Sequence, residues 1–461
     1  MTEALVGLLG SVRLRQPWMG DACLAVVAVL VASLWLARTR YLPRRRQLVA
    51  PLAGLAVGLA GWCAVDVVWR PVADGLGPVV WLWTGLAGTV VVQVLLGGGP
   101  REDGDRAHDW RQRLVHAVGS GTSIVAAVTA GLLAVNGFFA AFPSLAAVLG
   151  MDVVTTPLAA LPAAAARPSP PQRGEGVLSA TWSAPEDMPS RGEVVTAEIP
   201  AGDQSGTRGF RPREAMIYLP PAYLTEQRPA LPVVVALTGQ PGSPSDWYEL
   251  GALKDTMDAY AAEHDGLAPV VVVADLLGSP YRNPLCSDTE RGGRVATYLE
   301  RDVPDWIREN LQVDPDPAHW AVAGLSNGGT CALQVASRAP QVYPTFLALS
   351  AEEHPSLGTE GRTVRVGFGG DRAAYEANDP LAIMADAPPD RYAGVAGIVS
   401  VGRDDRAYRP VAPVLVDATT RAGMSVTQRD YPGRHTWALW SVAMADQMDW
   451  LGQRLGIAPA P

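Results

Sequence analysis

Lysine is almost absent from this chain of 461 residues, because Lys254 is the only lysine among 37 basic side chains. We attribute the arginine bias to coding composition and assign it no function. Acidic side chains number 46, and the formal net charge is −9. A chain with this charge offers little attraction to a phosphate backbone, so nucleic acid is excluded as a partner.

Cysteine is also scarce. Cys23 and Cys63 lie in apolar N-terminal segments, and Cys286 and Cys331 lie in the C-terminal half. None of them shows C-x-x-C spacing, so the sequence supports neither a zinc site nor a redox motif, and we expect no metal and no cofactor. No repeat of fixed period stands out in the sequence.

Apolar residues are concentrated in the first third of the chain. Crossing about 30 Å of hydrocarbon takes roughly 20 helical residues. Four stretches have about this length or more: 21–37, 49–69, 78–96 and 119–149. A cleaved signal peptide explains the first stretch poorly, because no small-residue cleavage site follows it and three more stretches do. The sequence therefore predicts an all-α domain of four transmembrane helices over residues 1–160.

Arginine is unevenly distributed around these stretches. Segment 38–46 contains five arginines and segment 101–113 contains four, whereas Arg70 is the only arginine between the second and third stretches. The positive-inside rule places both arginine-rich loops in the cytoplasm. The large C-terminal domain is then extracytoplasmic. Asp66 lies inside the second stretch, and we expect it to pair with Arg70 or to extend toward the interface rather than to have a function of its own.

Residues 161–187 are rich in Ala, Pro, Arg, Ser and Gly and have no helical or strand period, so they are predicted to form a linker. Residues 188–461 then alternate short β-rich runs with helical stretches. Eight runs are strand candidates, starting with GEVVTAEIP and ending with MSVTQRDYPG. This alternation is typical of an α/β domain, a mostly parallel sheet flanked by helices.

A G-x-S-x-G motif lies between the fifth of these strands and a helix. It reads Gly324-Leu325-Ser326-Asn327-Gly328. In this context the motif forms a nucleophile elbow, a tight turn that exposes the serine hydroxyl at the carboxyl edge of the sheet. We therefore predict Ser326 as a nucleophile and the backbone N–H of Asn327 as an oxyanion donor. The alternative is a glycine-rich turn without activity.

A serine nucleophile needs a base and an acid. His435 follows the last predicted strand, where the chain order Ser, acid, His places the base. His264 and His319 are expected to be structural, and His354 remains open as a substrate contact. The acid should follow a strand between Ser326 and His435, and GIVSVGRDD offers Asp405, which we favour, and Asp404 as the alternative.

The turn after the third strand, LTGQPG, is a candidate for the second half of an oxyanion hole. The backbone N–H of Gln240, next to Gly239, could donate to the oxyanion together with Asn327. The alternative is that this glycine-rich loop only turns the chain.

With these pieces in place, the region from about Gly192 to Gly456 resembles the esterase family that includes esterase D-like enzymes and mycolyltransferases. The segments that carry the resemblance are YLPPAY, LTGQPGSPSDW, NPLCSD, GLSNGGTCAL and YPGRHTWALW. The resemblance implies an α/β-hydrolase fold and acyl-ester hydrolysis or acyl transfer, with the roles given above for Ser326, His435, Gln240 and Asn327. Asn327 stands where methionine often follows the serine, and Thr238 stands where many relatives have histidine.

Cys286 lies in a loop before the elbow, and Cys331 follows Ser326 by five residues. In an oxidising compartment a disulfide between them would hold an active-site loop against the nucleophile helix. We predict this disulfide, with two free buried thiols as the alternative.

Taken together, the sequence predicts a membrane-anchored, extracytoplasmic serine esterase. Its expected partners are membrane lipids and a lipid- or envelope-linked ester, for example an aminoacyl-phospholipid. An acyltransferase that uses the same three residues is one alternative, because only access of an acceptor alcohol distinguishes the two. A catalytically silent envelope scaffold is the other.

Overall fold

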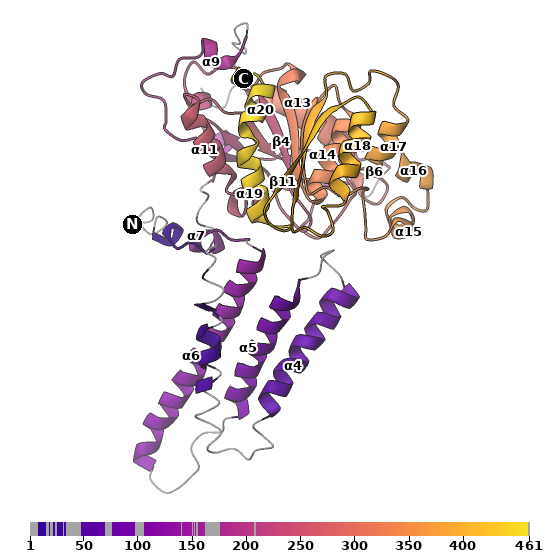
Figure 1. The fold of residues 1–461 in the computed structure, drawn as a ribbon. Helices are drawn as coiled ribbons and strands as arrows, with labels where there is room; N and C mark the ends of the chain where they lie inside the picture. Colours follow the sequence, from indigo (N-terminus) through magenta and orange to yellow (C-terminus); the bar gives the residue numbers. More distant parts are fainter. Residues whose placement is uncertain are drawn as a thin grey trace. The chain divides into compact units, whose positions relative to one another are not determined.

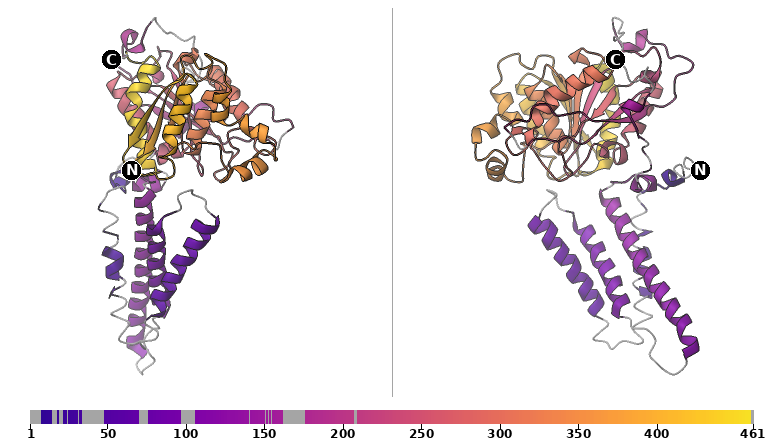
Figure 2. Two further views of the ribbon diagram at one scale, coloured as in Figure 1. Left: turned by 45° about the vertical axis from the view of Figure 1, so that its right-hand side comes forward. Right: turned by 180° about the vertical axis from the view of Figure 1, so that it is seen from behind.

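The computed structural model divides the chain into two compact units, Met1–Leu149 and Gly150–Pro461. It describes residues 8–14, 18, 22–23, 25–30, 32–33, 48–69, 76–96, 106–139, 141–149, 151, 153, 155–161, 176–206 and 209–459. Figures 1 and 2 show both units as ribbons, and each unit is described here by itself.

The N-terminal unit is helical. Its helices are α4 (Val49–Trp62), continued by the π-helical segment η1 (Cys63–Trp69), then α5 (Pro78–Leu96), α6 (Arg106–Phe139) and the short α7 (Leu145–Val148). Three stretches in the described residues are long and apolar enough to cross a membrane: Val49–Val68, Pro78–Leu95 and Val118–Gly137. Leucines on α4 such as Leu52 and Leu55 are exposed, as expected for side chains that face lipid.

These helices correspond to the second, third and fourth predicted spans. Of the first, 21–37, the structure describes residues 22–23, 25–30 and 32–33, which are helical. The fourth was predicted to run to residue 149, but α6 ends at Phe139. The side chain of Asn136 bonds both the N–H and the carbonyl of Phe142, at 2.7 and 3.0 Å. Ser144 then caps α7 by accepting from the N–H of Ala147 at 3.1 Å. These side-chain bonds replace the helical ones beyond residue 139.

Asp66 lies in η1, and its carboxylate has two donors from the following segment. The backbone N–H of Leu76 donates at 2.9 Å, and the indole N–H of Trp81 donates at 2.8 Å. The predicted partner, Arg70, lies outside the described residues. The carboxylate therefore links the end of α4–η1 to the start of α5, which is a structural role.

Helices α4 and α5 pack through glycines. A Cβ on Gly58 would lie 2.8 Å from the carbonyl oxygen of Trp81, and one on Gly54 would collide with Gly85 and Thr89 of α5. Small residues at a helix crossing allow backbones to approach closely, which is how packing stabilises helices in lipid, where a hydrophobic driving force is lacking.

We therefore expect Gly54→Leu to destabilise the α4–α5 pair by about 1–3 kcal/mol, because the added side chain forces the two backbones apart. Thermal unfolding of the detergent-solubilised full-length protein measures this. Gly131→Leu on α6 is the matched control, because a Cβ at Gly131 meets no described atom within 4 Å. Equal unfolding temperatures for the two variants would contradict the close packing.

The second unit is built on a nine-stranded sheet. Its strands, in spatial order, are β1 (Thr155–Pro157), β2 (Glu193–Ala197), β3 (Ala215–Leu219), β5 (Val270–Val273), β4 (Val233–Leu237), β8 (Trp320–Leu325), β9 (Thr345–Leu349), β10 (Ala396–Gly402) and β11 (Ser425–Tyr431). The pairs β2–β3 and β3–β5 are antiparallel and the others are parallel. Central strands such as β4 and β5 are apolar and buried along their length, because helices cover both faces.

Two groups of helices cover the sheet (Figure 1). In the first group, α17 (Pro380–Ala385) contacts both α14 (Asn327–Arg338) and α18 (Val411–Arg421). In the second group, α11 (Leu253–Glu263) contacts α19 (Trp437–Asp446), and α19 leads into α20 (Met448–Arg454). The remaining α-helices and strands of this unit are α9 (Leu178–Thr181), α10 (Asp246–Glu249), α12 (Val295–Thr297), α13 (Val303–Asn310), α15 (Glu360–Arg362), α16 (Arg372–Glu376), and the hairpin β6 (Asp288–Thr289) and β7 (Gly293–Arg294). Its 3-10 and π-helical segments are η2 (Leu158–Ala160), η3 (Pro221–Leu224), η4 (Tyr298–Asp302), η5 (Pro317–His319) and η6 (Thr363–Gly367). This is an α/β-hydrolase arrangement, so the predicted fold class of this domain is confirmed. Of the four helices predicted before it, three are found among the described residues to be long and apolar enough to cross a membrane.

The structure corrects the predicted boundaries of the linker. Residues 155–157 form β1, which pairs with β2, although the prediction assigned them to the membrane domain. Leu178, predicted to lie in the linker, is 2% exposed, and its N–H donates to Gly456 at 2.9 Å. The described parts of the predicted linker therefore belong to the second unit. Residues 162–175 of that linker lie outside the described residues.

Candidate active site

The nucleophile elbow is built by close backbone contacts. Strand β8 leads into Ser326, which has φ 54° and ψ −123°, and α14 begins at the next residue. This φ lies in the left-handed region that a non-glycine residue rarely adopts. Glycines surround the turn: a Cβ on Gly324 would collide with Gly328, and one on Gly329 would lie 2.7 Å from the carbonyl oxygen of Leu349. Only glycine fits at these positions.

Ser326, His435 and Asp405 form a hydrogen-bonded chain. The Oγ atom of Ser326 lies 2.9 Å from Nε2 of His435, and Nδ1 of His435 lies 2.9 Å from Oδ2 of Asp405. Asp405 is 1% exposed. The alternative acid, Asp404, is exposed at the surface, and only its backbone N–H, which donates to Gly433, contacts the loop of His435. The structure thus brings Asp405, and not Asp404, to the histidine.

The loops after β10 and β11 are bonded to each other, which brings the acid and the histidine together. The N–H of Arg403 donates to Tyr431 at 2.8 Å, and that of Asp404 donates to Gly433 at 3.0 Å. A Cβ on Gly402 would collide with Gly433, so the two loops approach at van der Waals contact only because residue 402 is glycine.

The loop of Gln240 lies against the elbow, since a Cβ on Gly239 would be 3.1 Å from Cβ of Ser326. Within the part of the chain that the structure describes, the backbone N–H groups of Gln240 and Asn327 have no acceptor. The side chain of Gln240 donates to the carbonyl of Tyr281 at 3.1 Å, which anchors the loop. Two unused N–H groups flanking Ser326 are the arrangement that an oxyanion hole requires.

The other histidines of this unit have partners of their own. Nδ1 of His264 is bonded to the carbonyl of Tyr260, at 2.9 Å, and Nδ1 of His319 is 2.9 Å from Asp314. His354 is bonded to Asp379 at 2.7 Å, and this hydrogen bond raises the pKa of His354. Among the described residues no group of three His, Cys, Asp or Glu side chains could hold a metal ion.

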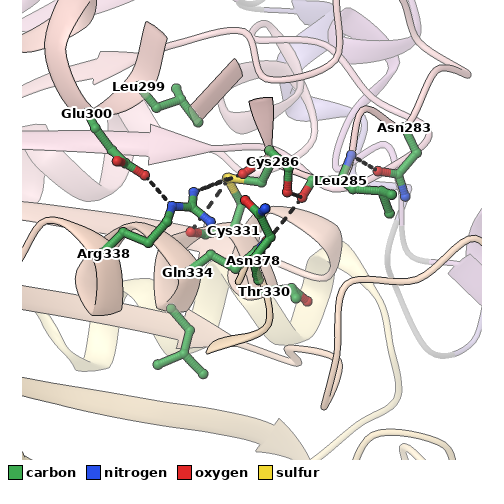
Figure 3. Close-up of a disulfide and its surroundings, with 12 residues drawn as sticks. Asn283, Leu285, Cys286, Leu299, Glu300, Thr330, Cys331, Gln334, Arg338 and Asn378 are labelled. Atoms are coloured by element: carbon green, nitrogen blue, oxygen red, sulfur yellow. Dashed lines mark hydrogen bonds and ion pairs between the residues drawn. A yellow bond between two sulfur atoms is a disulfide. The ribbon is translucent and has the colours of Figure 1, made fainter. Parts of the chain in front are cut away.

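Cys286 and Cys331 are joined by a disulfide, with their Cα atoms 5.5 Å apart (Figure 3). A further bond from α14 holds the same loop: the guanidinium of Arg338 donates to the carbonyl of Cys286 at 2.8 Å. The same guanidinium also donates to Glu300, which follows α12, at 2.6 Å. The amide of Gln334 donates to Leu285 at 3.2 Å. The loop that precedes β6 is thereby fixed to the helix that starts at the nucleophile.

Glu352 is a carboxyl group that sequence reasoning did not single out. It follows β9, and its backbone N–H donates to Oγ1 of Thr330 in the first turn of α14, at 2.9 Å. The side chain is partly buried, and this burial raises the pKa of Glu352 to about 7. Burial opposes ionisation because the charged form loses hydration.

This pKa predicts a pH dependence of stability. In the unfolded chain a glutamate ionises near pH 4.3, so the folded state holds an extra proton between about pH 4.5 and 7. The stability contributed by the protonated form is therefore lost as the pH rises through this window. Glu352→Gln removes the effect, and we expect its stability advantage over the unmodified protein to be larger at pH 8 than at pH 5. Chemical denaturation followed by tryptophan fluorescence tests this, and an advantage of equal size at both pH values would contradict it.

A serine at a strained strand–helix turn, bonded to a histidine and a buried aspartate at the carboxyl edge of this sheet, defines a serine hydrolase of the α/β-hydrolase fold. The Esterase family model matches residues 209–451, and the chain belongs to this family of carboxylic ester hydrolases. The match covers the elbow, the disulfide and the loops of Asp405 and His435.

Relatives and solved structures match different shares of the chain. An uncharacterized protein of Corynebacterium glutamicum is 31% identical over 94% of this chain and 95% of its own length. The S-formylglutathione hydrolase of Paracoccus denitrificans is 26% identical over 35% of this chain, a match that spans 57% of that enzyme. The solved structure of a ferulic acid esterase matches 58% of this chain and 99% of its own length, with 23% identity and a TM-score of 0.49. That of an S-formylglutathione hydrolase from Agrobacterium tumefaciens matches 59% of this chain and 98% of its own length, with 21% identity and a TM-score of 0.46.

Proposed function

We propose that this chain is a membrane-anchored esterase in which Ser326, His435 and Asp405 act as a catalytic triad on a carboxylic ester. The observation that carries the proposal is the chain of two 2.9 Å contacts from Ser326 through His435 to Asp405. The silent-scaffold alternative requires no such chain and no strained serine, because strain of this kind is retained where it serves a site.

The proposed reaction has two halves. Oγ of Ser326 attacks the ester carbonyl carbon while Nε2 of His435 takes its proton, and the N–H groups of Gln240 and Asn327 stabilise the oxyanion. Collapse of this intermediate breaks the bond to the alcohol, which leaves with the proton from His435. Water then attacks the acyl-enzyme, again losing a proton to His435, and release of the carboxylic acid restores Ser326.

For the substrate we propose a lipid- or envelope-linked ester, such as an aminoacyl-phospholipid. Three apolar helices and the hydrolase unit occur in one chain. The match to the Corynebacterium glutamicum protein spans both units, so the combination is not peculiar to this sequence. A membrane anchor keeps an enzyme close to esters held in or on the bilayer, which favours such substrates over freely diffusing ones.

We further propose that the hydrolase unit is extracytoplasmic. Segment 101–113, which includes the first turns of α6, holds four arginines, and this favours the cytoplasmic side for the start of that helix. If the chain crosses the membrane once through Val118–Gly137, the second unit lies outside the cytoplasm. The disulfide between Cys286 and Cys331 is consistent with an oxidising compartment.

The proposed triad predicts that replacing Asp405 lowers kcat much more than replacing its neighbour Asp404. We expect Asp405→Asn to lower kcat for a water-soluble ester such as p-nitrophenyl acetate by at least about 100-fold, because the histidine loses its orienting carboxylate. Asp404→Asn, the matched control at the exposed neighbour, should stay within about twofold of the unmodified protein. Steady-state kinetics of the purified protein decide this, and equal losses in both variants would refute the assignment of the acid.

The proposed sidedness predicts that the C-terminus is accessible from outside the cell. An antibody against a C-terminal tag should bind intact protoplasts of the expressing cells as strongly as permeabilised ones, because the second unit follows an outward crossing. A tagged cytoplasmic protein serves as the control. Binding that appears only after permeabilisation would place the hydrolase unit in the cytoplasm.

A further inference from the structure

The imidazole of His435 lies between two aromatic rings that the sequence did not point to. The ring of Tyr408 stacks on its face, with centroids 4.1 Å apart and planes inclined by 22°. The ring of Trp440 meets it nearly at right angles, 87°, with centroids 4.9 Å apart. One ring therefore restricts tilting of the imidazole and the other restricts its sideways movement.

Tyr408 is also bonded to the acid of the site. Its backbone N–H donates to Oδ1 of Asp405 at 3.2 Å, whereas Oδ2 of Asp405 faces Nδ1 of His435. The carbonyl of Tyr408 accepts from the N–H of Val411, at 3.0 Å, where α18 begins. A single residue thus holds the carboxylate through its backbone and the imidazole through its side chain.

Trp440 is anchored on the other side. Its indole N–H donates to Oγ of Ser350 at 3.2 Å, just after the end of β9. The neighbouring Trp437 packs edge-on against it, with centroids 5.4 Å apart. Because Trp440 is nearly buried and bonded at its polar end, its ring is a fixed wall beside His435.

The stacked ring has an electrostatic consequence during the reaction. The face of an aromatic ring carries negative charge density, so it attracts a cation placed over it. His435 becomes an imidazolium only when it takes the proton of Ser326, and the stack therefore strengthens as the transition state forms. An interaction that is stronger in the transition state than in the ground state raises kcat and leaves KM unchanged.

We propose that Tyr408 is a positioning residue of this active site, whose ring stabilises the imidazolium form of His435 and whose backbone N–H orients Asp405. The inference rests on the proposed esterase function and goes beyond it, because it adds an aromatic side chain to the three polar ones. The proposed role of Tyr408 requires no contact between its side chain and the substrate.

The first test compares Tyr408→Leu with Tyr408→Phe, using p-nitrophenyl acetate as substrate. Both variants keep the backbone N–H to Asp405, and only the leucine variant loses the ring. We expect Tyr408→Leu to lower kcat about tenfold with KM within about twofold, which corresponds to a cation–π contribution of about 1.4 kcal/mol. Tyr408→Phe should recover kcat to within about twofold of the unmodified protein. A leucine variant with unchanged kcat would overturn the inference.

The second test separates an effect through His435 from a general disturbance of the fold. In the His435→Ala background, Tyr408→Leu should have no further effect on the rate of fluorophosphonate labelling, because the imidazole is already missing. A tenfold loss in that background as well would show a structural role and would overturn the inference. Absence of esterase activity in the unmodified protein would instead refute the proposed function.

A third measurement applies even if the leucine variant fails to fold. Pentafluorophenylalanine at position 408 keeps the shape of phenylalanine but reverses the charge distribution of the ring face. We expect a kcat at least about threefold below that of Tyr408→Phe with KM unchanged. Equal kcat values for the two rings would overturn the inference, since packing alone cannot distinguish them.

Discussion

The site depends on one backbone constraint, the close approach of the main chain around the turn at Ser326. Gly324, Gly328 and Gly329 let the ends of β8, β4 and β9 and the start of α14 approach more closely than any side chain would allow. This approach holds Ser326 at φ 54° and directs its hydroxyl to the edge of the sheet, and among the described residues the N–H of Asn327 has no acceptor. A second close approach, between Gly402 and Gly433, brings the loops of Asp405 and His435 to the same edge.

The sequence identified the residues of the site better than their arrangement. Ser326 and His435 could be chosen because a motif and the order of strands, which are local patterns, mark their positions along the chain. The same means favoured Asp405 but left Asp404 open, because adjacent residues in a turn face different directions. The structure buries Asp405 beside His435 and leaves Asp404 exposed. Tyr408 gave no signal at all, since its role depends on stacking across two loops.

The errors in the domain boundaries have a physical origin. Residues 161–187 have the composition of a linker, but Leu178 is buried in the second unit and β1 adds a strand before that segment. Composition does not register a single apolar side chain that the second unit buries. Likewise, α6 ends before residue 149 because Asn136 and Ser144 provide competing hydrogen bonds, which hydropathy alone does not register.

The central claim is that Ser326 is an activated nucleophile, and mass spectrometry of the full-length protein after reaction with a fluorophosphonate tests it most directly. The account predicts one adduct per chain, on the peptide that contains Ser326, and no adduct when Ser326 is replaced by alanine. A folded protein that gains no adduct, or gains it on another residue, would contradict the account.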